Sequence, residues 1–120
     1  MDHQQLLEIL AHAWKTLDAS ELIHYIHPEF QYDSQKVFAS MYADEYPSYI
    51  TEKFKTIKKH GSKIEVSIVR DNYFGDGNMI KLVQNESNVA YLRIKVQDGK
   101  ISKMDMCMFS GVRRRRTNLL

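Results

Sequence analysis

Apolar residues at three- and four-residue spacing predict a helix at the start of the chain. One stripe follows this spacing: Leu6, Leu10, Ala13, Trp14 and Leu17. Asp18 with Glu21 three residues later has the form of a capping box, so a short second helix is expected to begin there. Pro28 is expected to end it, because the residue before a proline disfavours the helical conformation.

A short strand is predicted next, since Phe30 and Tyr32 alternate with Gln31 and Asp33. Residues 34–43 show no period and are interpreted as a loop.

A third helix is predicted to begin between Asp44 and Pro47, because proline suits the first turn of a helix. Its apolar stripe is Tyr46, Ile50, Phe54 and Ile57. Gly61 is expected to end this helix, following a basic last turn that suits the negative end of the helix dipole.

The chain after Gly61 has the pattern of an antiparallel sheet joined by hairpins. Four strands are predicted, at about residues 64–68, 79–84, 89–97 and 100–109. Turns are expected at Gly75–Asn78 and Asn85–Asn88, and Asp98–Gly99 is the strongest hairpin signal. In the third of these strands, Leu92, Ile94 and Val96 share one face, opposite Tyr91, Arg93 and Lys95. With the helices, this order predicts an α+β domain.

Composition narrows the class of protein. The chain has 120 residues, the size of one domain, and we expect a single domain at 1–110 with a flexible basic tail at 111–120. The net charge is +2, but Arg113–Arg116 supply four of the seventeen basic residues, and the remainder is mildly acidic. Nucleic-acid binding is therefore not expected, since the basic residues do not spread over a face.

The sequence also bears on the cellular location of the protein and on whether it can form a disulfide. Cys107 is the only cysteine, so no intramolecular disulfide can form. The first residues lack the pattern of a signal peptide, and no apolar run approaches the length of a membrane span. These features predict a cytoplasmic protein without a membrane partner.

Three segments together resemble the nuclear transport factor 2-like superfamily, which includes ketosteroid isomerases, scytalone dehydratase, polyketide cyclases and many bacterial proteins. They are LDASELIHYIHPEFQYDS, SYITEKFKTI and AYLRIKVQDGKISKMDMCMF, and the likeness extends from about Gln4 to Phe109. The resemblance implies a cone-shaped curved antiparallel sheet wrapped around three N-terminal helices, as in a cystatin-like roll. It also implies a small-molecule pocket at the open end of the cone and a homodimer through the outer sheet face.

The resemblance also allows a test of catalysis. Ketosteroid isomerases use a tyrosine on the first helix, an aspartate ending the first strand and a protonated acid on the penultimate strand. An ungapped placement puts Leu10, Ser34 and Leu92 at these positions. Shifting the alignment by one residue would bring Asp33 to the position of the base. The other two positions would still hold no acidic or hydroxyl side chain. The inward His and Asp pair of the dehydratase type cannot be placed, so these activities are disfavoured.

Asp33 is the candidate catalytic carboxylate, because an apolar pocket would raise its pKa and make it a general base. The same alternation that predicts its strand turns Asp33 away from Phe30 and Tyr32, so the alternative is an outward-facing residue. The resemblance assigns a ligand pocket to Leu10, Trp14, Tyr32, Leu92, Ile94, Met104 and Met106. Trp14 fits a pocket wall or an ordinary core equally well. The methionines could line a pocket, but their pattern favours ordinary core packing, because methionine commonly fills gaps in a core.

No cofactor or metal is expected, since the five histidines are not joined by a carboxylate or cysteine cluster. The leading functional hypothesis is a protein that binds a hydrophobic small molecule and forms a homodimer. The first alternative is an isomerase, dehydratase or cyclase acting on a polyketide- or steroid-like substrate. The second is a non-catalytic dimerisation domain.

Overall fold

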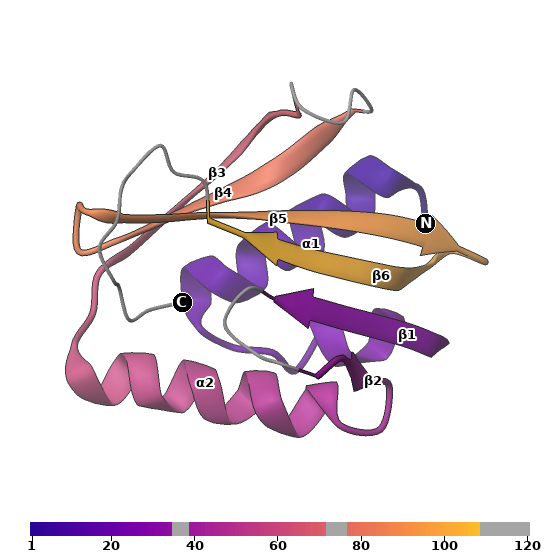
Figure 1. The fold of residues 1–120 in the computed structure, drawn as a ribbon, viewed down its shortest axis with the longest axis horizontal. Helices are drawn as coiled ribbons and strands as arrows, with labels where there is room; N and C mark the ends of the chain where they lie inside the picture. The colour runs from indigo at the N-terminus through magenta and orange to yellow at the C-terminus, as the bar shows by residue number, and fades with distance from the viewer. Residues whose placement is uncertain (35–38, 72–76, 109–120) are drawn as a thin grey trace.

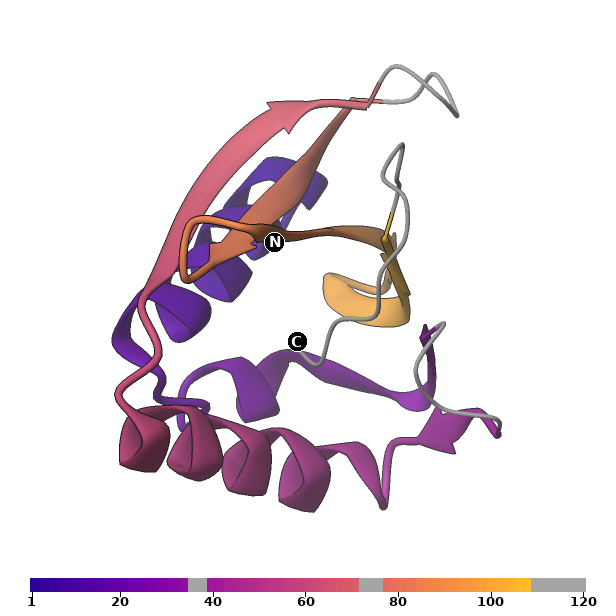
Figure 2. The ribbon, with the colours of Figure 1, turned by 60° about the vertical axis from the view of Figure 1, so that its left-hand side comes forward.

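A computed structural model of the protein describes residues 1–34, 39–71 and 77–108. It is an α+β structure, in which one sheet is flanked by two α-helices (Figures 1 and 2). The elements in chain order are α1 (His3–Thr16), the 3-10 helix η1 (Leu22–Tyr25), β1 (Ile26–Ser34), β2 (Met41–Tyr42), α2 (Tyr46–His60), β3 (Ile64–Arg70), β4 (Asn78–Gln84), β5 (Asn88–Gln97) and β6 (Lys100–Cys107).

The sheet has six strands in the order β2-β1-β6-β5-β4-β3. Strands β3 to β6 pair as antiparallel neighbours, as predicted, but β1 pairs in parallel with β6. The expectation of a wholly antiparallel sheet is therefore wrong. Hairpin signals specify only strands that are adjacent in sequence, and β1 instead meets the last strand after the chain has passed through α2.

The two helices contact different parts of the sheet. Helix α1 packs on β3, β4 and β5, whereas α2 runs alongside β1 (Figure 1). Figure 2 shows that the sheet twists strongly between β1 and the β3–β4 hairpin. No described helix is both long enough and apolar enough to cross a membrane.

The apolar stripes predicted for the two long helices are confirmed. Helix α2 buries Tyr46, Ile50, Phe54 and Ile57, and it ends at Gly61 with a positive φ of 68°. Helix α1 buries most of its predicted stripe, but Leu17 is the C-cap residue, with a φ of 54°. A capping box does form, at the start of α1 and between Asp2 and Gln5.

The predicted second α-helix is a single 3-10 turn, so the described residues contain two α-helices where the sequence predicted three. No capping box forms at this turn, because the Asp18 carboxylate accepts a hydrogen bond from the Ser20 N–H at 2.9 Å. Glu21 precedes the turn without a side-chain cap. Asp18 is instead the acceptor of a local turn, a role that aspartate often takes.

Strand β1 begins earlier than predicted, and Pro28 lies inside it instead of ending a helix. The register with β6 shifts between Ile26 and Gln31, so the proline falls where the ladder is interrupted. His27 lies in the same interruption, where its Nδ1 accepts a hydrogen bond from the Glu29 N–H at 2.9 Å. Its Nε2 therefore carries the proton and donates to the Asp98 carboxylate at 3.2 Å.

Several predictions for loops can be compared with the structure. The expected loop at 34–43 contains the two-residue strand β2. Asp98 and Gly99 form the expected hairpin turn, with φ of 56° and 74°, which is the type I′ geometry. Gly75, Asp76, Phe109 and the tail at 111–120 lie outside the described residues.

Replacing Gly99 by alanine is expected to destabilise the protein more than replacing Gly61. Both glycines have positive φ, so alanine costs about 1–2 kcal/mol of backbone strain at either position. A Cβ at Gly99 would also lie 2.9 Å from the Met1 nitrogen, whereas a Cβ at Gly61 meets nothing within 4 Å. Urea unfolding of both variants measures the difference, and equal losses would contradict the close approach.

Candidate functional site

The residues assigned to a pocket by the resemblance all lie on the helix-facing side of the sheet or on α1, inside one apolar core. They are Leu10, Trp14, Tyr32, Leu92, Ile94, Met104 and Met106. Each is at most 7% exposed. The fold therefore places these residues in its core, and a ligand pocket among them stays a prediction.

Three tyrosines form a cluster between β1 and α2. The ring of Tyr32 on β1 lies 5.0 Å from that of Tyr46 and 5.7 Å from that of Tyr49, measured between centroids. Tyr46 also packs against Phe30, at 4.9 Å. We call Tyr32, Tyr46 and Tyr49 the tyrosine cluster.

Two hydroxyls of the tyrosine cluster form hydrogen bonds to methionine sulfur atoms. The Tyr46 hydroxyl donates to Met104 Sδ at 3.4 Å, and the Tyr32 hydroxyl is 3.8 Å from Met106 Sδ. Tyr32 also has Ser34 and Tyr49 within hydrogen-bonding reach. A thioether is a weak acceptor, so the Tyr46 hydroxyl in particular is a buried donor with a weak partner.

Burial also fixes the protonation state of this cluster. It raises the pKa of Tyr32, Tyr46 and Tyr49 above the ordinary tyrosine value, because an ionised phenol would lose its hydration. At neutral pH these hydroxyls are therefore uncharged hydrogen-bond donors.

Trp14 carries a second kind of donor in the same core. Its indole is 1% exposed and packs edge-on against Phe54 of α2, with ring centroids 4.9 Å apart and an interplanar angle of 79°. The Trp14 Nε1–H has no hydrogen-bond partner among the described residues. A buried donor without a partner is rare, since it forfeits its hydrogen bond to water.

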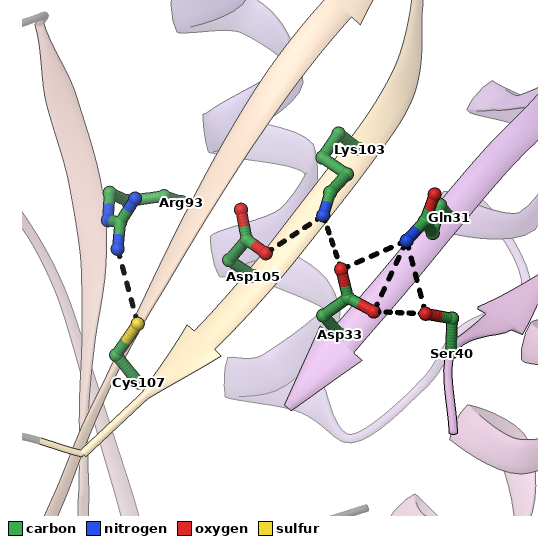
Figure 3. Close-up of polar contacts among 7 residues, drawn as sticks. All are labelled: Gln31, Asp33, Ser40, Arg93, Lys103, Asp105 and Cys107. Atoms are coloured by element: carbon green, nitrogen blue, oxygen red, sulfur yellow. Dashed lines mark hydrogen bonds and ion pairs between the residues drawn. The ribbon is translucent and has the colours of Figure 1, made fainter. Parts of the chain in front are cut away.

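Asp33 follows Tyr32 in β1, so its side chain lies on the opposite face of the sheet from the tyrosine cluster. Figure 3 shows the polar side chains around it. Its carboxylate forms an ion pair with Lys103 of β6 and accepts hydrogen bonds from the Ser40 hydroxyl and the Gln31 amide. Lys103 also donates to Asp105 at 3.1 Å, so one ammonium lies between two carboxylates on neighbouring strands. We call Gln31, Asp33, Ser40, Lys103 and Asp105 the outer polar cluster.

The outer polar cluster stabilises the ionised form of Asp33. Its hydrogen bond from Lys103, supported by the one from Ser40, lowers the pKa of the Asp33 carboxyl below its ordinary value. Burial alone would lower the pKa of Lys103, but the bonds to Asp33 and Asp105 outweigh it and raise that pKa. Asp33 therefore lacks the raised pKa of a base in an apolar pocket, and it points away from the core as the alternation indicates.

Arg93 and Cys107 lie further along this outer face (Figure 3). The Arg93 guanidinium donates to Cys107 Sγ at 3.2 Å, and its Nε is 3.6 Å from Asp71 Oδ2. Asp71 is only 5% exposed, so this ion pair supplies the countercharge that a buried carboxylate needs. Within the described ranges, no three His, Cys, Asp or Glu side chains gather as a metal-binding group.

Sequence reasoning did not identify the meeting of Tyr46 and Tyr49 with Tyr32. The stripe of α2 placed Tyr46 in the core, and Tyr49 lies three residues further along the same helix. What the sequence lacked was the position of α2 relative to β1, which depends on tertiary packing.

The fold of the chain is the nuclear transport factor 2-like fold, as comparison with solved structures shows. A nuclear transport factor 2-like protein from Anabaena variabilis has a TM-score of 0.67 at 11% identity, covering 89% of this chain and 86% of the other. A protein with a cystatin-like fold from Caulobacter vibrioides has a TM-score of 0.61 at 18% identity, covering 89% and 87%.

An enzyme also shares this fold. An epoxide hydrolase from M. tuberculosis has a TM-score of 0.56 at 16% identity, covering 85% of this chain and 78% of the other. No protein-family model and no curated protein sequence matches the chain. The resemblance indicated by the sequence is thus confirmed at the level of the fold, which alone does not determine activity.

Proposed function

We propose that this protein binds an uncharged hydrophobic small molecule between its helices and the inner face of its sheet. The site would be lined by Trp14, the tyrosine cluster and the thioethers of Met104 and Met106. The observation that carries this proposal is the weak or missing hydrogen bonding of buried donors, namely Trp14 Nε1 and the Tyr46 hydroxyl.

The chemistry of these residues suits such a ligand. Aromatic rings and flexible thioethers give adaptable apolar contacts, while a few donors orient the ligand. In this proposal the twisted sheet forms the wall of a cone, as in the cystatin-like roll, and the ligand enters between α2 and the sheet.

Catalysis is not part of the proposal. Asp33 lies on the outer face and is ion-paired with Lys103. Leu10 and Leu92, at the positions that the resemblance assigns to catalytic side chains, are fully buried aliphatic residues. An isomerase or dehydratase would need an inward acid or base to transfer a proton.

Binding can be tested with protein carrying 13C-labelled methionine methyl groups. Fluorene and 9-fluorenone are suitable probes, since both are flat and uncharged. We expect them to shift the signals of Met104 and Met106, which lie in the inner core. Met79 is the matched control, because it is 3% exposed but lies outside that core, and its signal should not move.

The binding experiment also has a clear negative result. If neither probe shifts Met104 or Met106 up to its solubility limit, the proposed site is wrong. The variant Asp33→Asn should bind both probes as the unaltered protein does, because Asp33 faces the other side of the sheet. Weaker binding by this variant would instead favour a site on the outer face.

We also propose that the outer sheet face makes a homodimer. Its β1 and β6 side carries Asp33 and Asp105 around the single Lys103, which leaves one negative charge in excess, and its β5 and β4 side carries Lys95 and Lys81. A two-fold axis that lies in the interface, parallel to the strands, would bring the acidic side of one copy to the basic side of the other.

Sedimentation analysis tests the dimer. We expect a dimer that weakens in Lys95→Glu, whereas Lys58→Glu, an exposed change on α2, should leave it intact. A protein that stays monomeric at high concentration would contradict this assembly.

A further inference from the structure

The open edge of the sheet at β3 carries an inference about a partner, and this inference is independent of the proposed ligand site. Strand β3 is the last strand of the sheet, so it pairs with β4 on one side and with no described strand on the other (Figure 2). At the opposite end of the sheet, the edge strand β2 has only two residues. The seven residues Ile64–Arg70 therefore form the long open edge of this sheet.

The backbone hydrogen bonds show which groups of β3 lie on that edge. The Asp71 N–H donates to the Gly77 carbonyl at 3.0 Å, and the Lys63 carbonyl accepts from the Asn85 N–H at 2.9 Å. Because successive residues of a strand direct their N–H and C=O groups to opposite sides, the odd-numbered residues of β3 bond to β4. The even-numbered residues direct theirs away from β4, where no described residue bonds to them. They are Ile64, Val66, Ile68 and Arg70.

Strand β3 lacks the features by which proteins commonly protect an edge strand. Its pairing with β4 follows one unbroken register without a bulge, and it contains no proline. On the helix side, Ile64, Val66 and Ile68 form a half-buried aliphatic row that continues the core. On the outer side, Glu65 and Ser67 are exposed. An edge with free backbone groups and an aliphatic row on one face is suited to the addition of another strand.

The sequence of β3 fits a second copy of itself in the antiparallel direction. Glu65 lies near the start of the strand and Arg70 at its end, so antiparallel pairing brings opposite charges to the same end of the pair. Parallel pairing would place like charges side by side. The free backbone groups also require an even-numbered residue to lie opposite an even-numbered one. This condition is met over the whole strand when Ser67 lies opposite its counterpart and Val66 lies opposite Ile68.

We propose that β3 pairs antiparallel with β3 of a second copy, about a two-fold axis that passes between the two Ser67 residues. The two sheets then become one continuous sheet, and the aliphatic row of one copy meets that of the other on the helix side. Isologous contacts of this kind are the commonest in homo-oligomers. The contact uses the edge of the sheet and leaves its outer face free, so it is additional to the outer-face dimer and joins such dimers to one another.

A cysteine at the two-fold axis tests the register. Opposite residues without mutual hydrogen bonds have Cα atoms about 4.5 Å apart, a separation that a disulfide spans. Cys107 is the only cysteine, so Cys107→Ser provides a background without thiols. In this background, Ser67→Cys should form a disulfide-linked dimer under mild oxidation. Glu65→Cys is the control, because Glu65 lies opposite Val69 in this register and should remain largely unlinked.

Sedimentation equilibrium of the Lys95→Glu variant measures the edge contact separately, because this change weakens the outer-face dimer. We expect the variant still to associate through β3. Adding Ser67→Lys places two like charges opposite each other and should weaken this association about fivefold. The added positive charge lies on the basic side of the outer face, so repulsion there cannot explain the loss. Ser48→Lys, an exposed change on α2, should have no effect.

Several results would overturn the proposal. A Lys95→Glu variant that stays monomeric at high concentration would show that β3 does not pair with itself. Equal linking of Ser67→Cys and Glu65→Cys would indicate random collision instead of a fixed register. If the monomer binds an extended peptide of alternating valine and threonine, the edge accepts a strand from a different chain, and self-pairing is wrong. The proposed ligand site lies in the core and stands or fails by its own probes.

Discussion

Above about pH 10, the free energy of unfolding of this protein is expected to fall steeply. Tyrosines in the unfolded chain ionise near that pH, whereas burial raises the pKa of Tyr32 and Tyr46 in the folded state. The folded protein therefore keeps protons that the unfolded chain releases. Their contribution to stability is complete below the unfolded pKa and is lost as the pH rises toward the folded pKa.

The size of this effect follows from proton linkage. Each tyrosine that stays protonated in the folded state and ionises in the unfolded state lowers the free energy of unfolding by about 1.4 kcal/mol per pH unit. Tyr32 and Tyr46 together give a slope of about 2.7 kcal/mol per pH unit, and the less buried Tyr49 adds a smaller amount. Lys103 acts in the same direction, because its pKa is also raised in the folded state.

Urea unfolding at several pH values between 8 and 11 (roughly the range in which phenols ionise) measures this slope. Tyr46→Phe removes one of the ionising groups and should reduce the slope by about half of the two-tyrosine value. Tyr42→Phe is the control, because Tyr42 is 50% exposed and should leave the slope unchanged. A flat profile up to pH 11 would contradict the burial of the tyrosine cluster.

Truncating Phe54 to alanine is expected to cost about 3–5 kcal/mol of stability, the usual range for a buried aromatic residue. Phe54 is 2% exposed and joins α2 to α1 through its contact with Trp14. The loss is comparable to the whole stability of many domains of this size. The variant is therefore expected to be partly unfolded at room temperature.

Denaturant unfolding followed by Trp14 fluorescence measures this loss, since the indole lies against the truncated ring. Tyr42→Ala is the matched control, because it removes an aromatic ring that is half exposed and should cost within about 0.5 kcal/mol. A loss below 1 kcal/mol for Phe54→Ala, on the order of an ordinary surface change, would show that the two helices do not depend on this contact.

Local patterns predicted the elements that depend on local chemistry. The stripe of α2, its end at Gly61 and the Asp98–Gly99 turn follow directly from helical spacing and from turn residues. The outward position of Asp33 was also predictable, because alternation in a strand assigns neighbouring residues to opposite faces.

Relations between distant segments were not predictable in this way. Asp33 lies beside Lys103, and no pattern in the sequence joins residues that are seventy positions apart. The same holds for Tyr32 and Tyr46, whose contact depends on the packing of α2 against β1. The resemblance to known proteins predicted the overall fold. Hairpin signals predict only antiparallel pairs of strands that are adjacent in sequence, so they could not predict the parallel pair of β1 and β6.

The pairing of β1 with β6 has a consequence for the order of folding. Strands β3 to β6 can form by closing short loops, whereas β1 must wait for a partner that lies about seventy residues further along the chain. Pairing across such a separation slows folding, because the entropy of closing the chain is lost before the contacts form. During synthesis, β1 leaves the ribosome early and stays without its parallel neighbour until β6 has emerged. Its Phe30 and Tyr32 can already pack against Tyr46 of α2, but the edge of β1 that pairs with β6 stays open to aggregation until the sheet is complete.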